Sequence, residues 1–202
     1  ILSPYTVAAR FFAKALESGL KTIVFTRARR ITELITTWVL QEAPHLKGRI
    51  SSYRAGFLPE ERRDIETKLF SGSMDGVIST SALEMGIDVG GLDLCILVGY
   101  PGTIINTWQR GGRVGRGNRP SAIVMIAGSD ALDQYFIRNP EDFFGRNCEE
   151  AVLDPMNREV LKRHIPCAAS ETPLVPDEPW LQNEKVRSIV DELEQSSVLA
   201  RY

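Results

Sequence analysis

Residues 109–117 read QRGGRVGRG, a run in which Arg110, Arg113 and Arg116 recur every third position among glycines. Residues three apart on a helical turn face the same way. Glycine lets neighbouring backbone approach closely, and arginine supplies a planar, permanently charged fork that suits phosphate oxygens. No acidic residue occurs between Thr103 and Ser129. The segment therefore predicts a local anion site, and a triphosphate tail is the ligand that such a clamp would fit.

Two other interpretations of this segment stay open. Its glycines partly match the dinucleotide-binding pattern G-x-G-x-x-G, which leaves a strand, opens a helix and has an acidic residue about 20 residues later. Here residues 105–109 precede the glycines and a predicted strand at 122–127 follows them, so the order differs. The other interpretation is a solvated basic loop, and the interleaved glycines count against it because a surface loop does not need them.

Outward from this segment, short β-branched runs alternate with helical patterns, which favours parallel strands joined by crossover helices. The expected strands are 22–25, 49–53, 77–79, 94–98 and 122–127, and the expected helices between them include 7–20, 31–40 and 60–70. Five or six strands of this kind make an open, mostly parallel α/β sheet. Ligand-binding residues in such sheets gather beyond the carboxyl ends of the strands, so we expect the arginine segment there.

The β pattern stops after about Gly128, and prolines become frequent. Helical patterns at 153–169 and 184–198 predict a helical C-terminal extension. We therefore expect two domains, residues 1–130 and residues 131–202. The start of an accessory domain of the winged-helix type is one interpretation of residues 184–202.

Composition limits the class of protein. The chain has 202 residues, is 43% hydrophobic and carries a net charge of -2, which are ordinary values for a globular protein. It has neither an apolar run of about 20 residues nor a leader pattern, so we expect a cytoplasmic protein without a membrane anchor. Both ends resemble boundaries within a longer polypeptide. The cysteines Cys95, Cys148 and Cys167 form no C-x-x-C pair, which predicts buried free thiols rather than a zinc or redox site.

Four segments, in sequence order, resemble the motifs of superfamily 2 helicases. They are Ile23–Arg30 for motif IV, Tyr53–Gly56 with Pro59–Arg63 for the segment that follows it, Ser79–Asp88 for motif V and Gln109–Arg116 for motif VI, Q-x-x-G-R-x-G-R. Residues 157–174 are also similar to the segment that follows the second motor domain in DEXH helicases akin to mitomycin repair factor A. The four-cysteine zinc domain of those proteins is not among these residues.

This resemblance implies a second RecA-like motor domain, with helices on both faces of its sheet, which works with a first RecA-like domain of the same polypeptide. ATP and Mg²⁺ would lie between the two domains and be bound mainly by the first. The resemblance assigns Arg113 and Arg116 as arginine fingers, which are worth roughly 10³ to 10⁵ in rate. It places Gln109, Gly86 and Asp88 at the nucleotide; for Asp88, a loop or helix cap is the alternative.

Nucleic acid is the second ligand that the resemblance implies, with DNA expected and RNA not excluded by these motifs. Contacts would run mainly to phosphates and sugars, which give affinity without sequence reading. The matching positions are Thr26, Arg27, Arg54, Thr80 and Ser81. The chain contains neither G-x-x-x-x-G-K-[ST] nor Asp-Glu-x-His, so alone it should not hydrolyse ATP. The alternative is a binding or regulatory module that keeps the helicase fold and works without hydrolysis.

Overall fold

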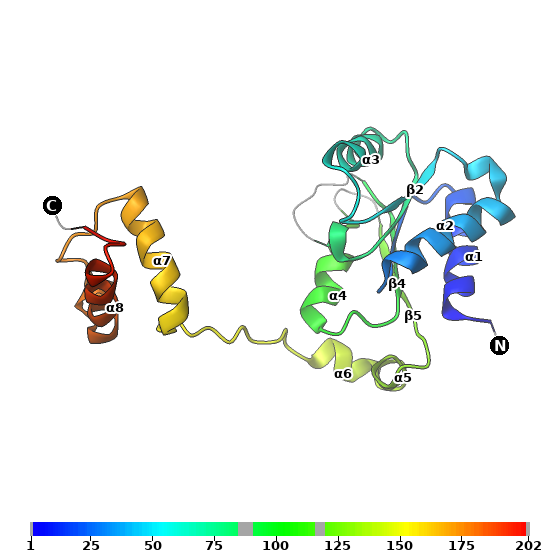
Figure 1. The fold of residues 1–202 in the computed structure, drawn as a ribbon. Coiled ribbons are helices and arrows are strands. Elements are labelled where there is room, and N and C mark those ends of the chain that lie inside the picture. Colours follow the sequence, from blue (N-terminus) through cyan, green and yellow to red (C-terminus); the bar gives the residue numbers. More distant parts are fainter. Residues whose placement is uncertain (1, 85–90, 116–119, 201–202) are drawn as a thin grey trace. The chain divides into compact units, whose positions relative to one another are not determined.

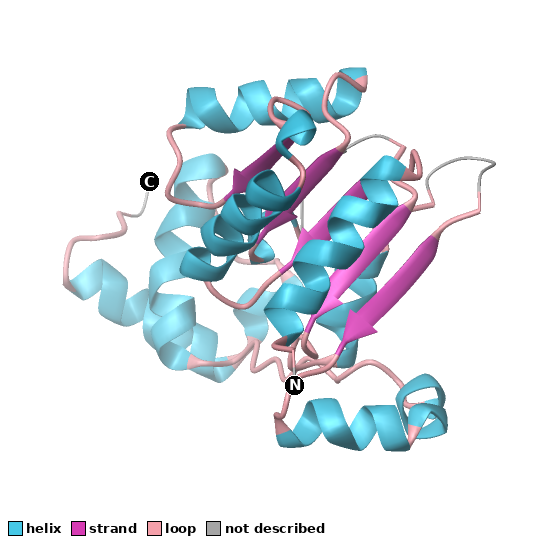
Figure 2. Cartoon of the chain, turned by 90° about the vertical axis from the view of Figure 1, so that its right-hand side faces the viewer, coloured by secondary structure: helices cyan, strands magenta, loops and turns pink. Residues whose placement is uncertain are grey.

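The computed structural model describes residues 2–84, 91–115 and 120–200, and the chain divides into two compact units, residues 1–149 and residues 150–202. Within the described residues, the first unit contains one five-stranded sheet in the order β2-β3-β1-β4-β5. All four pairings are parallel, and Figure 2 shows the strands running in one direction. The strands are β1 (Thr22–Phe25), β2 (Ile50–Tyr53), β3 (Gly76–Ser79), β4 (Leu94–Val98) and β5 (Ala122–Ile126). The predicted fold class is confirmed.

Helices cover both faces of this sheet (Figure 1). One face packs against α1 (Pro4–Glu17) and α2 (Arg29–Glu42), and the other lies against α3 (Pro59–Ser71) and α4 (Ile104–Gly111). Alternate strand residues divide between these two cores: Val24 and Ile96 belong to the first, and Ile23 and Cys95 to the second. Strands that are apolar on both faces are typical of a parallel sheet covered by helices.

Local sequence signals set the ends of these helices. The Ser3 side chain accepts a hydrogen bond from Thr6 N at the start of α1, and Pro4 occupies the first turn. Pro59 opens α3, where its missing N–H has no intrahelical partner to lose. Gly72 ends α3 with φ 76°, a left-handed conformation that glycine adopts without steric cost.

The segment after β5 begins with α5 (Ala131–Arg138) and α6 (Pro140–Gly145), which belong to the first compact unit. The second unit contains α7 (Arg158–Glu171) and α8 (Glu184–Gln195), packed around Ile165, Ile189 and their neighbours. The compact units therefore divide at residue 149, whereas the domain boundary predicted from the sequence lies at residue 130. The winged-helix assignment stays a prediction.

Two sequence-based expectations need correction. The helix expected from residue 153 begins at Arg158, because the Asn157 side chain caps it by accepting from Glu159 N and Val160 N. The three thiols are free, but only Cys95 is buried, while Cys148 and Cys167 are exposed. None of the described helices is long and apolar enough to cross a membrane.

Candidate functional site

Three of the predicted ligand-binding residues lie next to one another at the carboxyl edge of the sheet. Phe25 of β1 and Tyr53 of β2 both pair with Ser79 of β3, so the residues that follow them, Thr26, Arg54 and Thr80, come from adjacent strand ends. Arg27 and Ser81 extend the group by one residue each. The fold therefore brings together all five residues that the sequence assigned to nucleic acid.

These residues differ in what they can offer a ligand. Thr26 is 1% exposed, and its hydroxyl donates to Ala28 O at 3.2 Å, so its side chain is used inside the protein. Arg54 is half-buried; its Nε lies 3.0 Å from a Glu33 carboxylate oxygen, and its guanidinium lies 4.9 Å from the centre of the Phe57 ring. Ser81 is exposed and Thr80 is half-buried. Thr80 and Ser81 therefore bring hydroxyls toward the surface, whereas the Arg54 guanidinium is shared with Glu33.

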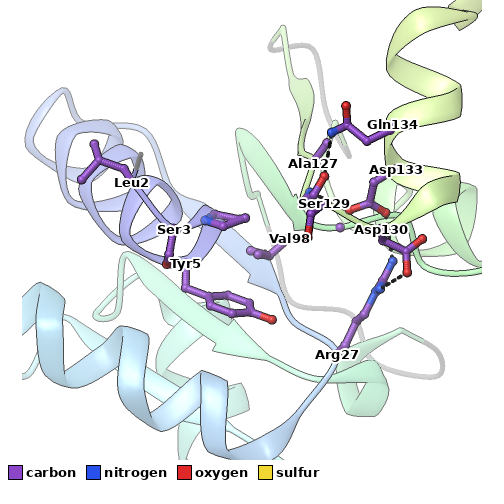
Figure 3. Close-up of a pocket in the computed structure, with 13 residues that line it drawn as sticks. Leu2, Ser3, Tyr5, Arg27, Val98, Ala127, Ser129, Asp130, Asp133 and Gln134 are labelled. Carbon is purple, nitrogen blue, oxygen red and sulfur yellow. Dashed lines mark hydrogen bonds and ion pairs between the residues drawn. The ribbon is translucent and has the colours of Figure 1, made fainter.

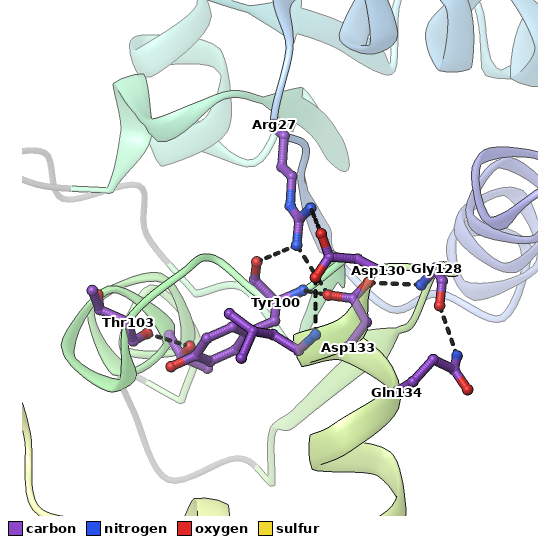
Figure 4. A network of polar contacts seen from close by, with 9 residues as sticks. Arg27, Tyr100, Thr103, Gly128, Asp130, Asp133 and Gln134 are labelled. Atoms are coloured by element: carbon purple, nitrogen blue, oxygen red, sulfur yellow. Dashed lines mark hydrogen bonds and ion pairs between the residues drawn. The ribbon is translucent and has the colours of Figure 1, made fainter.

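Arg27 is held in a network that joins three strand ends (Figure 4). Its Nη2 donates to Tyr100 O at 2.7 Å and to Asp133 Oδ1 at 2.9 Å. The Asp133 carboxylate, 2% exposed, also accepts from Tyr100 N at 2.8 Å and from Gly128 N at 2.7 Å. Asp133 therefore ties the residue after β1 to the loops after β4 and β5. With its side chain 46% exposed, Arg27 still presents part of its guanidinium to solvent.

A pocket of about 840 Å³ lies beside this network, at the carboxyl ends of β1, β4 and β5 (Figure 3). Tyr5 from the first turn of α1 and Arg27 line it together with Asp130 and Gln134 from the start of α5. The hydrogen bond from Leu132 N, and after it the Arg27 guanidinium, hold the pKa of Asp130 below its ordinary value. With Asp133 beside Asp130, the carboxylates outnumber the arginine, so the pocket itself does not have the charge of a phosphate site.

Residues 109–115, the described part of the arginine segment, lie toward the opposite edge of the sheet, which corrects the expected position. Val114 bridges to Leu92, and Gly115 N donates to Leu92 O at 3.3 Å, just before β4 begins. The reason is that α4 is a crossover helix. It leaves the carboxyl end of β4 and returns the chain to the amino end of β5, so its last turn and Arg113 reach the amino edge.

The turn after α4 arranges the arginine segment. Arg113 N donates to Arg110 O at 3.1 Å, and Arg113 Nε lies 3.4 Å from Gln109 O. Gln109 and Arg113 are half-buried, whereas Arg110 is 8% exposed. Gly115 has φ 78°, which a side-chain-bearing residue rarely adopts. Among the other predicted residues, Gly86, Asp88 and Arg116 lie outside the described residues.

The other end of α4 is capped by a residue that sequence reasoning did not single out. Glu149, the last residue of the first unit, accepts from Ile104 N at 2.7 Å and from Ile105 N at 3.1 Å. These backbone hydrogen bonds hold the pKa of Glu149 below its ordinary value. A carboxylate at a helix N-terminus also interacts favourably with the helix dipole. Asp133 and Glu149 were not found from the sequence because each is a single carboxylate, and Asp133 meets Tyr100 and Glu149 meets Ile104 from far along the chain.

Comparisons with known proteins show which proteins this chain resembles. Residues 7–118 match the family model described as the helicase conserved C-terminal domain. The chain is 42% identical to the ATP-dependent helicase YprA of Bacillus subtilis, over 92% of this chain and 25% of that protein. It is 38% identical to the ATP-dependent helicase hrq1 of Schizosaccharomyces pombe, over 85% of this chain and 17% of that protein.

Solved structures give the same result. The DUF1998 helicase MrfA, bound to DNA, superposes with a TM-score of 0.86 at 39% identity, over 100% of this chain and 27% of that chain. The same helicase bound to DNA and AMPPNP superposes with a TM-score of 0.84. The chain thus spans about a quarter or less of the length of these relatives.

Proposed function

Since the chain belongs to the family of helicase conserved C-terminal domains, we propose that it is the second RecA-like motor domain of an ATP-dependent helicase or translocase that acts on nucleic acid, with DNA as the substrate. The DNA-bound helicase of similar structure supports the choice of DNA. The alternative, a module that binds without hydrolysis, is not favoured, because the relatives are named as ATP-dependent helicases.

One observation carries the proposal: two sets of candidate residues occupy opposite edges of one sheet. Arg54, Thr80 and Ser81 stand at the carboxyl edge, and Arg113 follows α4 at the amino edge. A motor domain needs two separate ligand faces, one for the strand and one for the nucleotide. A sheet packed between two layers of helices provides a rigid connection between them.

ATP is the ligand of the amino edge in this proposal. Negative charge develops on the γ-phosphate oxygens during phosphoryl transfer, and a guanidinium that meets this charge stabilises the transition state. Arg113 and Arg116 would serve as these fingers, with Gln109, Gly86 and Asp88 beside the nucleotide. The phosphate-binding loop and the carboxylate that holds Mg²⁺ would come from a first RecA-like domain, because these 202 residues contain neither motif.

Nucleic acid is the ligand of the carboxyl edge. Arg54 supplies a charge, while Thr80 and Ser81 supply hydroxyls that suit phosphate and sugar contacts. Thr26 would contribute to this edge by its place at the end of β1, because its hydroxyl is buried. Arg27 would contact nucleic acid through the exposed part of its guanidinium. These few groups suffice for the part of the nucleic-acid track, the surface along which the strand would lie, that this domain supplies. A small number of basic contacts agrees with the small net charge of the chain.

The proposal is tested by Arg113→Ala in the longer polypeptide that includes the first motor domain. ATP turnover stimulated by single-stranded DNA should fall by about 10³-fold or more. The melting temperature should stay unchanged, since Arg113 is only half-buried. Arg138→Ala, which removes an exposed arginine from the same unit, is the matched control and should turn over ATP normally. A variant that retained half of the wild-type rate would refute the assignment.

A second measurement tests the carboxyl edge. Arg54→Ala should weaken binding to single-stranded DNA about equally for all sequences and reduce the salt slope by about 1, as expected for the loss of one phosphate contact. An unchanged slope would remove Arg54 from the proposed track.

A further inference from the structure

The first arginine of the arginine segment makes an ion pair in the protein interior. Arg110 Nε lies 2.8 Å from Glu84 Oε2, and each residue is 8% exposed. The Arg110 guanidinium also lies 5.5 Å from the centre of the Phe25 ring. The Arg110 side chain is therefore buried in an internal ion pair and does not reach a nucleotide in this arrangement.

Stability alone does not account for such a pair. Removing two charges from water costs free energy that their attraction only partly returns, and apolar side chains of similar volume are often as stable or more stable in the same place. What an ion pair adds is direction, because a guanidinium and a carboxylate bind each other in few orientations. The pair is thus suited to fixing how two segments lie relative to each other.

The two segments are those that carry the proposed ligand contacts. Glu84 closes the short turn that begins at Ser81, since Glu84 N donates to Ser81 O at 2.9 Å. Arg110 lies in the last turn of α4, and its carbonyl accepts from Arg113 N at 3.1 Å. Two backbone hydrogen bonds and one ion pair therefore connect Ser81, at the carboxyl edge, with Arg113, at the amino edge.

We propose that Arg110 is a positioning residue: through Glu84 it holds the arginine segment in register with the turn after β3, so that contact of that turn with nucleic acid sets the position of Arg113 at the nucleotide. This inference rests on the proposed function. It explains why the arginine three residues before the proposed finger is buried. It also gives Glu84, which no motif role had covered, a part in coupling the two ligand faces.

The test replaces both partners, Glu84→Met with Arg110→Met, in the longer polypeptide with its first motor domain. Filling the site with apolar side chains keeps the packing, so the melting temperature and the KM for ATP should stay close to those of the wild type. The DNA-stimulated kcat should fall on the order of 10²-fold, because displacement of a catalytic group by about 1 Å costs that much. Reversing the pair, Glu84→Arg with Arg110→Glu, should recover part of the lost kcat.

A matched control separates positioning from the loss of any ion pair. Arg49 and Asp75 form a more exposed arginine–carboxylate pair, Nε to Oδ2 at 2.5 Å, before β2 and β3, so this control tests the loss of an ion pair away from the proposed ligand faces. Replacing both by Met should leave kcat and DNA stimulation unchanged. If the Glu84 and Arg110 double variant does not fold, Glu84→Gln, which keeps the shape and removes the charge, decides by the same kcat measurement.

The outcomes distinguish this inference from the proposed function. The positioning role is overturned if the double variant, or Glu84→Gln, folds and keeps the wild-type kcat and the wild-type DNA stimulation. The proposed function still stands in that case, provided that the wild-type enzyme is active in the same assay. A wild-type polypeptide without DNA-stimulated ATP turnover would instead refute the proposed function itself.

Discussion

Asp133→Asn should destabilise the first unit, because this carboxylate is buried and accepts three hydrogen bonds. In the wild type, Oδ1 accepts from Tyr100 N and Arg27, and Oδ2 accepts from Gly128 N at 2.7 Å. Asparagine has one oxygen, so the best rotamer keeps the Tyr100 and Arg27 contacts and turns an NH₂ group toward Gly128 N. One backbone amide then loses its acceptor, and the remaining bonds lose the negative charge.

The magnitude follows from these losses. A buried amide without an acceptor costs about 1–3 kcal/mol, and a hydrogen bond to a charged group is worth about 1 kcal/mol more than a neutral one. We therefore expect a loss of about 3 kcal/mol in the free energy of unfolding of the first unit. For a urea m-value of about 2 kcal/mol/M, the unfolding midpoint falls by about 1.5 M.

The assay is urea unfolding of the 202-residue chain followed by circular dichroism, combined with hydrogen exchange of the Gly128 amide, which should lose protection. Asp142→Asn is the control, because that partly exposed carboxylate bonds to the side chains of Arg146 and Tyr135 and to no described backbone amide; its midpoint should change much less. A midpoint for Asp133→Asn equal to that of the wild type would show that the three strand ends do not depend on this carboxylate.

Two further predictions concern ionisable groups in the core. Burial raises the pKa of the Cys95 thiol to about 12. At pH 8, iodoacetamide should therefore alkylate the exposed Cys148 and Cys167 in the native chain and Cys95 only after unfolding, which mass spectrometry can count. Three rapid alkylations of the native chain would contradict the buried position of Cys95. Burial, and then the hydrogen bond to Glu66, raise the pKa of Tyr53 from 10.0 to about 12, so its contribution to stability is present below pH 10 and is lost as pH rises toward 12. Tyr53→Phe should remove that part of the decline between pH 10 and 12 in melting curves, and an unaltered decline would assign it to other groups.

Much of the fold was predictable because its strands are apolar on both faces and rich in β-branched residues. Thr22–Phe25 and Leu94–Val98 have the boundaries expected from the sequence. Residues directly after strands were also predictable as neighbours, since parallel strands end at a common edge. The position of the arginine segment was not, because the rule for carboxyl ends does not apply to residues at the far end of a crossover helix.

The polar contacts that hold the site could not be predicted from the sequence, for a different reason. Asp133 meets Tyr100, Glu149 meets Ile104, and Glu84 meets Arg110 across 33, 45 and 26 residues of chain respectively. A single acidic residue belongs to no repeating pattern and to no motif of fixed spacing, so only the packed structure identifies its partner.

The Glu149 cap on α4 limits how far the first unit can be shortened. The family match ends at residue 118, before β5, yet Glu149 supplies the acceptor for the first amides of α4 and Asp133 the acceptor for the loops after β4 and β5. A piece trimmed at residue 118 or 130 would lose both carboxylates and leave these amides open to solvent. We therefore expect the smallest independently stable version of this unit to extend through residue 149, about thirty residues past the segment by which its family is recognised.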